Sequence, residues 1–175
     1  VLPGTYKVSM AKSENGVITD LGQSQEFELM PLRNTTLPAK DGKALVDFQR
    51  KVSETARIVQ GTSKKAAQLK KRIGLIRVAL HNTPEASQNM ANKAKELDDR
   101  LNDILISLEG NKSISKRNAN QPPAITDRLG SLLWGGYRTT SEPTQTMKDQ
   151  LKIIEKEYGQ IHDKLVKWVN DLKEL

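Results

Sequence analysis

The fold of this chain is decided by residues 147–175, MKDQLKIIEKEYGQIHDKLVKWVNDLKEL. Apolar side chains recur here at alternating spacings of four and three residues, at Met147, Leu151, Ile154, Tyr158, Ile161, Leu165, Trp168, Leu172 and Leu175. On an α-helix this spacing gathers them into one narrow stripe, which is buried only against other helices. The stretch therefore predicts a long helix inside a helical bundle.

A second long helix is predicted over residues 41–81. One heptad position holds Leu45, Val52, Val59, Ala66, Ile73 and Leu80, and the other holds Phe48, Thr55, Thr62, Leu69 and Ile76. A break follows at Asn82-Thr83-Pro84-Glu85, in which Pro84 is expected at the first helical position. A connection this short makes the flanking helices antiparallel neighbours.

The next helix is predicted to end near Glu109, with Gly110 as its stop. Its stripe consists of Met90, Ala94, Leu97, Leu101, Ile104 and Leu108. Residues 111–123 are polar and are expected to form an exposed loop. A short amphipathic helix then starts near Ile125 and is expected to end at Gly135-Gly136, where it caps the bundle or lies across it. Residues 140–144 introduce the last helix.

The first 32 residues read as β-structure. Residues 5–10 and 25–30 alternate apolar and polar side chains, and Ser13-Glu14-Asn15-Gly16 is a turn signal in which Gly16 can take a positive φ. Two or three strands bury too little surface to stand alone. The prediction is therefore a mainly α chain: strands over 1–32, a linker over 33–40, and an antiparallel three-helix bundle with a short capping helix over 41–175.

Composition narrows the function. The 175 residues include 36% hydrophobic, 4% aromatic and 28% charged residues, with no cysteine. The lack of cysteine excludes disulfides, thiolate nucleophiles and cysteine-based metal sites. No apolar run approaches the roughly 20 residues that a membrane-spanning helix needs, so a soluble chain is expected. Because the chain starts at Val1, without methionine or a charged leader, we interpret it as a mature fragment or an excised region.

The net charge of +7 raises the question of anionic partners. Six basic residues lie in one stretch: Lys64, Lys65, Lys70, Lys71, Arg72 and Arg77. Such a cluster can neutralise phosphates, but the stretch contains no aromatic residue to stack on bases and no DNA-binding motif. The preferred interpretation is the solvated outer face of a long helix. The alternative is a basic helical module that binds nucleic acid or another anionic surface.

Residues suited to catalysis are scarce. His81 and His162 form no ligand pair, so neither a metal nor a cofactor is expected. Carboxylates are numerous but are predicted on outer helix faces, where they pair with lysines rather than across a sugar-binding cleft. Trp134 is expected to pack into the end of the bundle. If Trp134 and Tyr137 are exposed together instead, they become the best candidates for contact with a protein partner or a carbohydrate.

Several segments resemble a known family. Residues 3–8 (PGTYKV) and 25–29 (QEFEL) resemble the last strands of an immunoglobulin- or fibronectin-like module. Their continuation, with PAITDRLGSL at 123–132 and SEPTQ at 141–145, is similar to the C-terminal region of bacterial sortilin-like, BNR-repeat β-propeller proteins, often labelled glycosyl hydrolases. At the strand–helix junction the chain has Met30-Pro31-Leu32-Arg33 where that group has Asp-Pro-Arg.

This resemblance implies a non-catalytic C-terminal region of a larger secreted or periplasmic protein. The implied partners are the adjacent β-propeller and immunoglobulin-like domains of the same parent chain. Any hydrolase activity would lie in the upstream propeller, and no catalytic residue of the group maps onto this sequence. The expected function is therefore structural: the helical rod braces a neighbouring domain and offers a surface to a partner.

Overall fold

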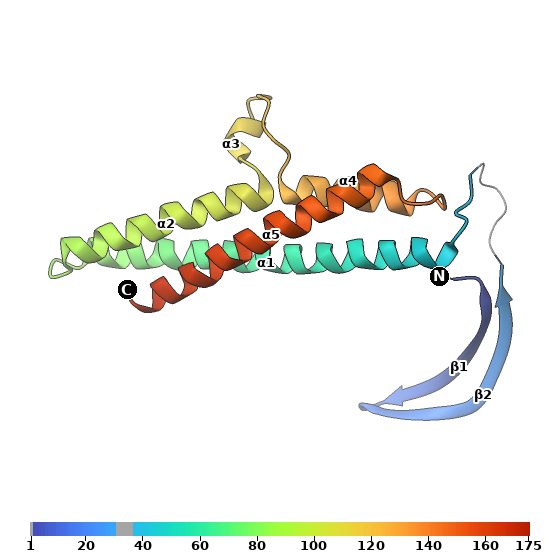
Figure 1. Ribbon diagram of the computed structural model, residues 1–175. Coiled ribbons are helices and arrows are strands. Elements are labelled where there is room, and N and C mark those ends of the chain that lie inside the picture. The colour runs from blue at the N-terminus through green and yellow to red at the C-terminus, as the bar shows by residue number, and fades with distance from the viewer. Residues whose placement is uncertain (1, 31–36) are drawn as a thin grey trace.

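A computed structural model describes residues 2–30 and 37–175, and shows a mainly helical chain that begins with a β-hairpin (Figure 1). The hairpin consists of β1 (Gly4–Glu14) and β2 (Val17–Leu29). The described residues then form five helices: α1 (Gly42–Asn82), α2 (Gln88–Glu109), α3 (Lys112–Ser115), α4 (Ile125–Tyr137) and α5 (Gln145–Lys173). The predicted linker over 33–40 falls outside the described residues at positions 33–36.

The hairpin is antiparallel, and its turn is the one that the sequence predicts. Glu14 pairs with Val17, which leaves Asn15 and Gly16 as a two-residue turn with φ of 51° and 82°. Two positive φ values in succession fit the twist of a hairpin, and asparagine and glycine tolerate them best. Within residues 4–29 no side chain is buried. The strands therefore contribute no core of their own.

Local signals explain where the long helices begin. The Asp41 carboxylate accepts hydrogen bonds from the backbone N–H groups of Lys43 and Ala44, and the Thr144 hydroxyl accepts one from Met147. These side chains satisfy N–H groups that have no partner inside the first turn. At 1.5 Å per residue, the 41 residues of α1 span about 60 Å.

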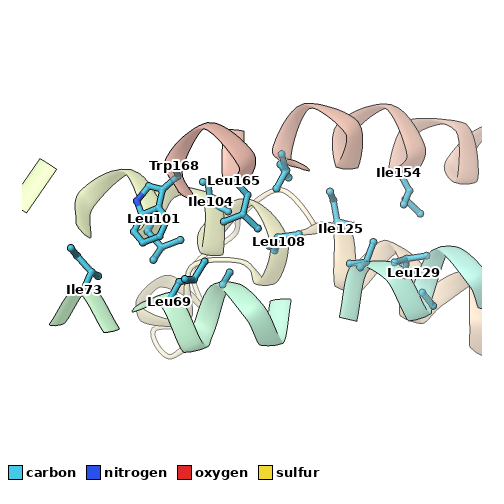
Figure 2. Packing of buried hydrophobic residues seen from close by; sticks show 14 of the residues in the cluster. Leu69, Ile73, Leu101, Ile104, Leu108, Ile125, Leu129, Ile154, Leu165 and Trp168 are labelled. Atoms are coloured by element: carbon cyan, nitrogen blue, oxygen red, sulfur yellow. The ribbon is translucent and has the colours of Figure 1, made fainter. Parts of the chain in front are cut away.

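The helices pack together along the whole of α1. In Figure 1, α2 lies along the C-terminal half of α1, α4 lies along the N-terminal half, and α5 crosses both. The predicted apolar stripes meet in one cluster, to which α1, α2, α4 and α5 all contribute (Figure 2). Ile73, Leu101 and Ile161, which come from the three predicted long helices, are all buried there. The heptad-based prediction of mutually packed helices is confirmed.

Polar contacts reinforce this packing between elements. Trp168 is fully buried, and its indole Nε1 donates to the backbone oxygen of Leu97 over 2.7 Å. Thr62 on α1 and Tyr158 on α5 share a hydroxyl–hydroxyl hydrogen bond of 2.8 Å. These bonds satisfy the polar ends of two large aromatic side chains that sit in or beside the core.

Two predicted helix boundaries are wrong. Pro84 does not open α2, because residues 84–86 form a turn and Ser87 caps the helix by accepting from the backbone N–H of Met90. The cap is Ser87, so α2 begins at Gln88, four residues after the position predicted from Pro84. The two glycines at 135 and 136 do not end α4, which continues to Tyr137. Burial of Gly136 beside α1 outweighs its weak helix propensity.

The short helix also lies elsewhere than expected. A hydrogen bond of 2.9 Å from Gln49 Nε2 to the backbone oxygen of Gly136 fixes the end of α4 against the side of α1. At its other end, Thr126 Oγ1 donates to the backbone oxygen of Leu108 on α2 over 3.0 Å. Helix α4 therefore continues the line of α2 along α1 rather than capping the bundle. No helix in the described residues combines the length and hydrophobicity that a membrane crossing requires.

Candidate interaction surfaces

Helix α4 leaves two aromatic residues in solvent. Its buried positions are Ile125, Leu129, Leu132 and Gly136, spaced by four, three and four residues. Trp134 and Tyr137 lie off this stripe and are 69% and 71% exposed. The expectation that Trp134 packs into the bundle end is therefore wrong, because the turns of α4 that face the core are occupied by smaller residues.

We call Trp134, Tyr137 and the adjacent Arg138 the aromatic surface. The guanidinium carbon of Arg138 lies 5.4 Å from the centre of the Trp134 ring. This is the distance of a cation–π contact, and such contacts contribute about 0.5–1 kcal/mol at exposed sites. The Tyr137 hydroxyl is 3.1 Å from the Ser53 hydroxyl on α1. Both aromatic side chains thus have a neighbouring contact and remain largely exposed.

A surface of this kind is suited to recognition. Exposed tryptophan and tyrosine offer large, rigid and partly polar contact areas, and they dominate many protein–protein interfaces. The flat rings can equally stack on the apolar face of a sugar. The structure brings the two predicted contact residues, Trp134 and Tyr137, together on one face of one helix.

The predicted basic cluster does not act as one surface. The ammonium group of Lys70 lies 2.8 Å from Oδ1 of Asp98, and Arg77 Nη1 contacts Oδ2 of the same carboxylate. Asp98 is on α2 and is buried between the helices. Lys70 and Arg77 therefore tie α1 to α2 and serve the fold.

The environment of Asp98 contains opposing electrostatic effects. Burial by itself raises the pKa of the Asp98 carboxyl, but hydrogen bonds and positive charge from Lys70, and then from Arg77, lower it. The attractive contributions are larger together, so the pKa of Asp98 is held below its ordinary value. The carboxylate is ionised at neutral pH and is paired on both oxygens.

The other four basic residues face solvent. Lys64, Lys65, Lys71 and Arg72 are exposed, and none of them forms an ion pair with the described residues. We call these four side chains the basic face. Lys64 and Lys71 lie on the side of α1 opposite the buried residues Ala66 and Ile73, and Lys65 and Arg72 lie on the adjoining flank. Of the six predicted contact residues, the structure thus assigns two to helix packing and leaves four available.

Concave regions between the helices are open to solvent. A groove of about 510 Å³ runs between α2 and α5, with Ile104 and Ile161 among its lining residues and with Glu96, Asp103, Lys164 and Lys167 beside them. Another groove of about 700 Å³ lies between the end of α1 and the start of α2. Both grooves mix charged and apolar side chains, and neither gathers two carboxylates in a desolvated pocket.

Metal ligands are not brought together in the part of the chain that the structure describes. No group of three histidine, cysteine, aspartate or glutamate side chains converges there. His81 lies in the last turn of α1, whereas His162 on α5 lies beside Asp163, with 3.8 Å between Nδ1 and Oδ1. The two imidazoles belong to separate surfaces.

The carboxylates, Asp98 among them, were predicted on outer helix faces as partners of lysines, and for Asp98 the outer position is wrong because the residue is buried. The signal was present: Lys70 and Arg77 are seven residues apart on α1, so they share one flank, and Asp98 sits next to the buried Leu97 on α2. An acid beside an apolar stripe, facing two cations, is typical of an interhelical ion pair. From the sequence, the six basic residues on α1 were interpreted only as a solvated face or as a surface for an anionic partner.

Comparison with known proteins adds no relative. No protein-family model matches the chain, and neither a curated protein nor a solved structure is similar to it. The resemblance to the C-terminal region of sortilin-like, BNR-repeat proteins therefore stays a prediction.

Proposed function

We propose that this chain is a non-catalytic structural and interaction module of a larger secreted or periplasmic β-propeller protein. Its mechanism is positional. An antiparallel three-helix bundle forms a rod about 60 Å long, to which the hairpin is joined at one end. The rod spaces or braces the neighbouring domains of the parent chain and presents the aromatic surface to a partner.

The observation that carries this proposal is the continuity of the apolar core along α1. Near the C-terminal end of α1 the core is formed with α2 and α5, and near the N-terminal end it is formed with α4 and α5. We interpret α2 and α4 as two segments that together take the place of one helix of the bundle. Each end of α1 is then part of a three-helix arrangement. A rod with a continuous core resists bending, because bending would open packed interfaces.

The hairpin fits the proposal as the end of an immunoglobulin-like module. Tyr6 and Phe27 stack with ring centres 6.0 Å apart, and they share the face of the hairpin that also holds Val8. This apolar face is exposed. Two strands rarely stand alone, so we infer that further strands of the parent protein pair with the hairpin and cover it.

The joint between the two parts supports a fixed arrangement at the start of the rod. Residues 37–40 lie against the α4–α5 connection: Ala39 N–H donates to the Thr140 oxygen over 2.9 Å, and Lys40 N–H donates to Glu142 Oε1 over 3.0 Å. The Ser141 hydroxyl donates to the Leu37 oxygen over 2.6 Å. The chain that enters the rod is thus held against the loop that follows the aromatic surface.

The stiffness of the rod is open to a direct test by distance measurement. The chain lacks cysteine, so spin labels can be attached at Lys43→Cys and Asn82→Cys, two exposed positions at the ends of α1. We expect one narrow distribution centred at about 58 Å, from 39 residues at 1.5 Å each. A broad distribution or a shorter second population contradicts a bracing function.

The parentage is tested by the coding sequence upstream of Val1. We expect propeller repeats with Asp-boxes, preceded by a signal peptide. An upstream region that encodes an unrelated cytoplasmic protein contradicts the proposed parent. The narrow distance distribution would then still hold, so the rod and its origin are tested separately.

A further inference from the structure

Helix α1 has an unusual distribution of charge. Residues 55–84 contain seven lysine and arginine residues and no aspartate or glutamate. The first of these cations, Arg57, is paired with Glu54 one turn earlier, with 2.6 Å between Nη2 and Oε1. Lys70 and Arg77 form ion pairs with Asp98 on α2. The basic face is what remains, and no acid in the same stretch offsets it.

Two aliphatic side chains lie within the same outward side of α1. Leu75 is 72% exposed and Val78 is 57% exposed. Lys64, Lys71, Leu75 and Val78 follow one another at spacings of seven, four and three residues, which places them in a single stripe along the helix. The basic face and these aliphatic residues therefore form one continuous surface.

The geometry of this surface is long and straight. Figure 1 shows α1 as a nearly straight helix, with α2 and α4 along one side of it and α5 crossing over it. Val78 follows Lys64 by 14 positions, which corresponds to about 21 Å along the helix. A flat partner can lie along the stripe from Lys64 to Leu75, and at Val78 it meets the edge of the open groove between α1 and α2.

The combination of cations and aliphatic side chains selects the kind of partner. On an anionic bilayer, lysine and arginine contact lipid phosphates while leucine and valine enter the boundary of the acyl chains. Nucleic acid would use the cations but not Leu75 or Val78, and no aromatic residue lies between Phe48 and Trp134 to stack on bases. The exposed aliphatic residues therefore favour a lipid surface.

We propose that the outward side of α1, from Lys64 to Val78, is a peripheral docking surface for an anionic phospholipid bilayer. In this arrangement α1 lies parallel to the membrane plane. The basic face supplies the electrostatic attraction, and Leu75 and Val78 supply shallow apolar contact. The proposal is independent of the parent protein and of the aromatic surface.

The test is sedimentation of the purified chain with lipid vesicles. Vesicles of phosphatidylcholine alone are compared with vesicles that also contain phosphatidylglycerol. We expect binding only to the anionic vesicles, with a partition coefficient that falls as salt is added. Equal binding to both vesicle types, or no binding to either at low salt, overturns the proposal.

Two double variants locate the contact. Lys71→Glu with Arg72→Glu is expected to lower partitioning at least about tenfold, since each cation near the surface contributes about fivefold. The matched control is Lys148→Glu with Lys156→Glu, two exposed lysines on α5 with the same change in net charge. The control is expected to lower partitioning by less than about threefold, because it leaves the docking surface intact. Equal losses in the two variants contradict a specific surface.

The aliphatic contribution separates lipid from nucleic acid. Leu75→Ser with Val78→Ser is expected to lower vesicle partitioning about threefold to tenfold, because the shallow apolar contact is lost. Binding to a DNA duplex, used as the competing probe, is expected to be weaker than binding to anionic vesicles and unaffected by this change. If the double-serine variant binds vesicles as well as the unmodified chain does, and DNA is bound more tightly than anionic vesicles, the basic face is assigned to nucleic acid instead. Circular dichroism confirms that each variant stays helical.

Discussion

The helical part and the hairpin both place apolar side chains on one face, but they differ in what covers that face. Every long helix turns its apolar stripe toward another helix of the same chain. In the hairpin, Val8, Met10 and Phe27 are exposed although the strands pair along most of their shared edge, with one irregularity between Ser9 and Ala11. Backbone pairing alone thus gives regular structure without a core.

The physical reason is how each kind of element satisfies its backbone hydrogen bonds and finds a surface to pack on. A helix satisfies its own backbone hydrogen bonds, and a short connection then brings a second helix close enough to bury both stripes. A two-stranded ribbon satisfies only its inner edge and has nothing to pack on. The difference locates the stability of the chain in residues 42–173 and leaves the hairpin dependent on further contacts.

The largest expected effect comes from the core of the helical part. Trp168→Ala removes a fully buried indole and its hydrogen bond to Leu97, and is expected to cost about 3–5 kcal/mol of unfolding free energy. Urea denaturation followed by circular dichroism measures this loss.

The matched control for this variant is Trp134→Ala on the aromatic surface. The same residue type is removed, but Trp134 is exposed, so the expected change stays within about 0.5 kcal/mol. Similar losses for the two tryptophans would mean that the core is not where the structure places it.

The next largest effect concerns the ion pairs between α1 and α2. Asp98→Asn keeps the shape of the side chain but removes the charge that Lys70 and Arg77 share, at an expected cost of about 2 kcal/mol. Asp99→Asn is the control, because Asp99 pairs with Lys95 on the surface of α2 at 3.1 Å and is expected to cost about 0.5 kcal/mol or less.

The same carboxylate makes the helical part sensitive to acid. Because the pKa of Asp98 is lower in the folded chain than in the unfolded chain, its contribution to stability is present above about pH 4 and is lost as the pH falls toward the folded pKa. The difference in unfolding free energy between the unmodified chain and Asp98→Asn is therefore expected to become smaller below pH 4. A deficit that is constant with pH would show that the charge of Asp98 does not stabilise the fold.

A smaller effect compares two glycines that both have a positive φ. Gly110 ends α2 with φ of 80°, and Gly16 lies in the hairpin turn with φ of 82°. An alanine at either position is strained by about 1 kcal/mol. We expect Gly110→Ala to lower the thermal midpoint of the helices and Gly16→Ala to leave it unchanged. A shift from Gly16→Ala would show that the hairpin and the helices unfold together.

The periodic parts of the sequence predicted most of this architecture. The stripe in residues 147–175 correctly places Leu151, Ile154, Ile161, Leu165 and Trp168 in the core. In α1 the heptad pattern also succeeded but missed the buried Ala56 and Ser63. A straight helix has 3.6 residues per turn, so its buried face drifts away from a strict seven-residue repeat over 41 residues.

The candidate surfaces were harder to predict because they depend on single positions. Trp134 was assigned to the core by residue type, whereas the four-three-four spacing of Ile125, Leu129, Leu132 and Gly136 excludes it from the buried stripe. The basic cluster was correctly placed on α1. Which of its side chains pair with Asp98 and which face solvent depends on the tertiary contact with α2. Local pattern cannot supply that contact.

Amide hydrogen exchange of the intact chain tests the central claim most directly. The claim is that the helices share one core while the hairpin has none, so the amides of Val59, Ile73, Leu101 and Ile161 are expected to exchange only by global unfolding. Amides within Gly4–Leu29 are expected to exchange orders of magnitude faster. Equal, strong protection in the hairpin and in α1 would contradict the account, because it would require a shared cooperative core.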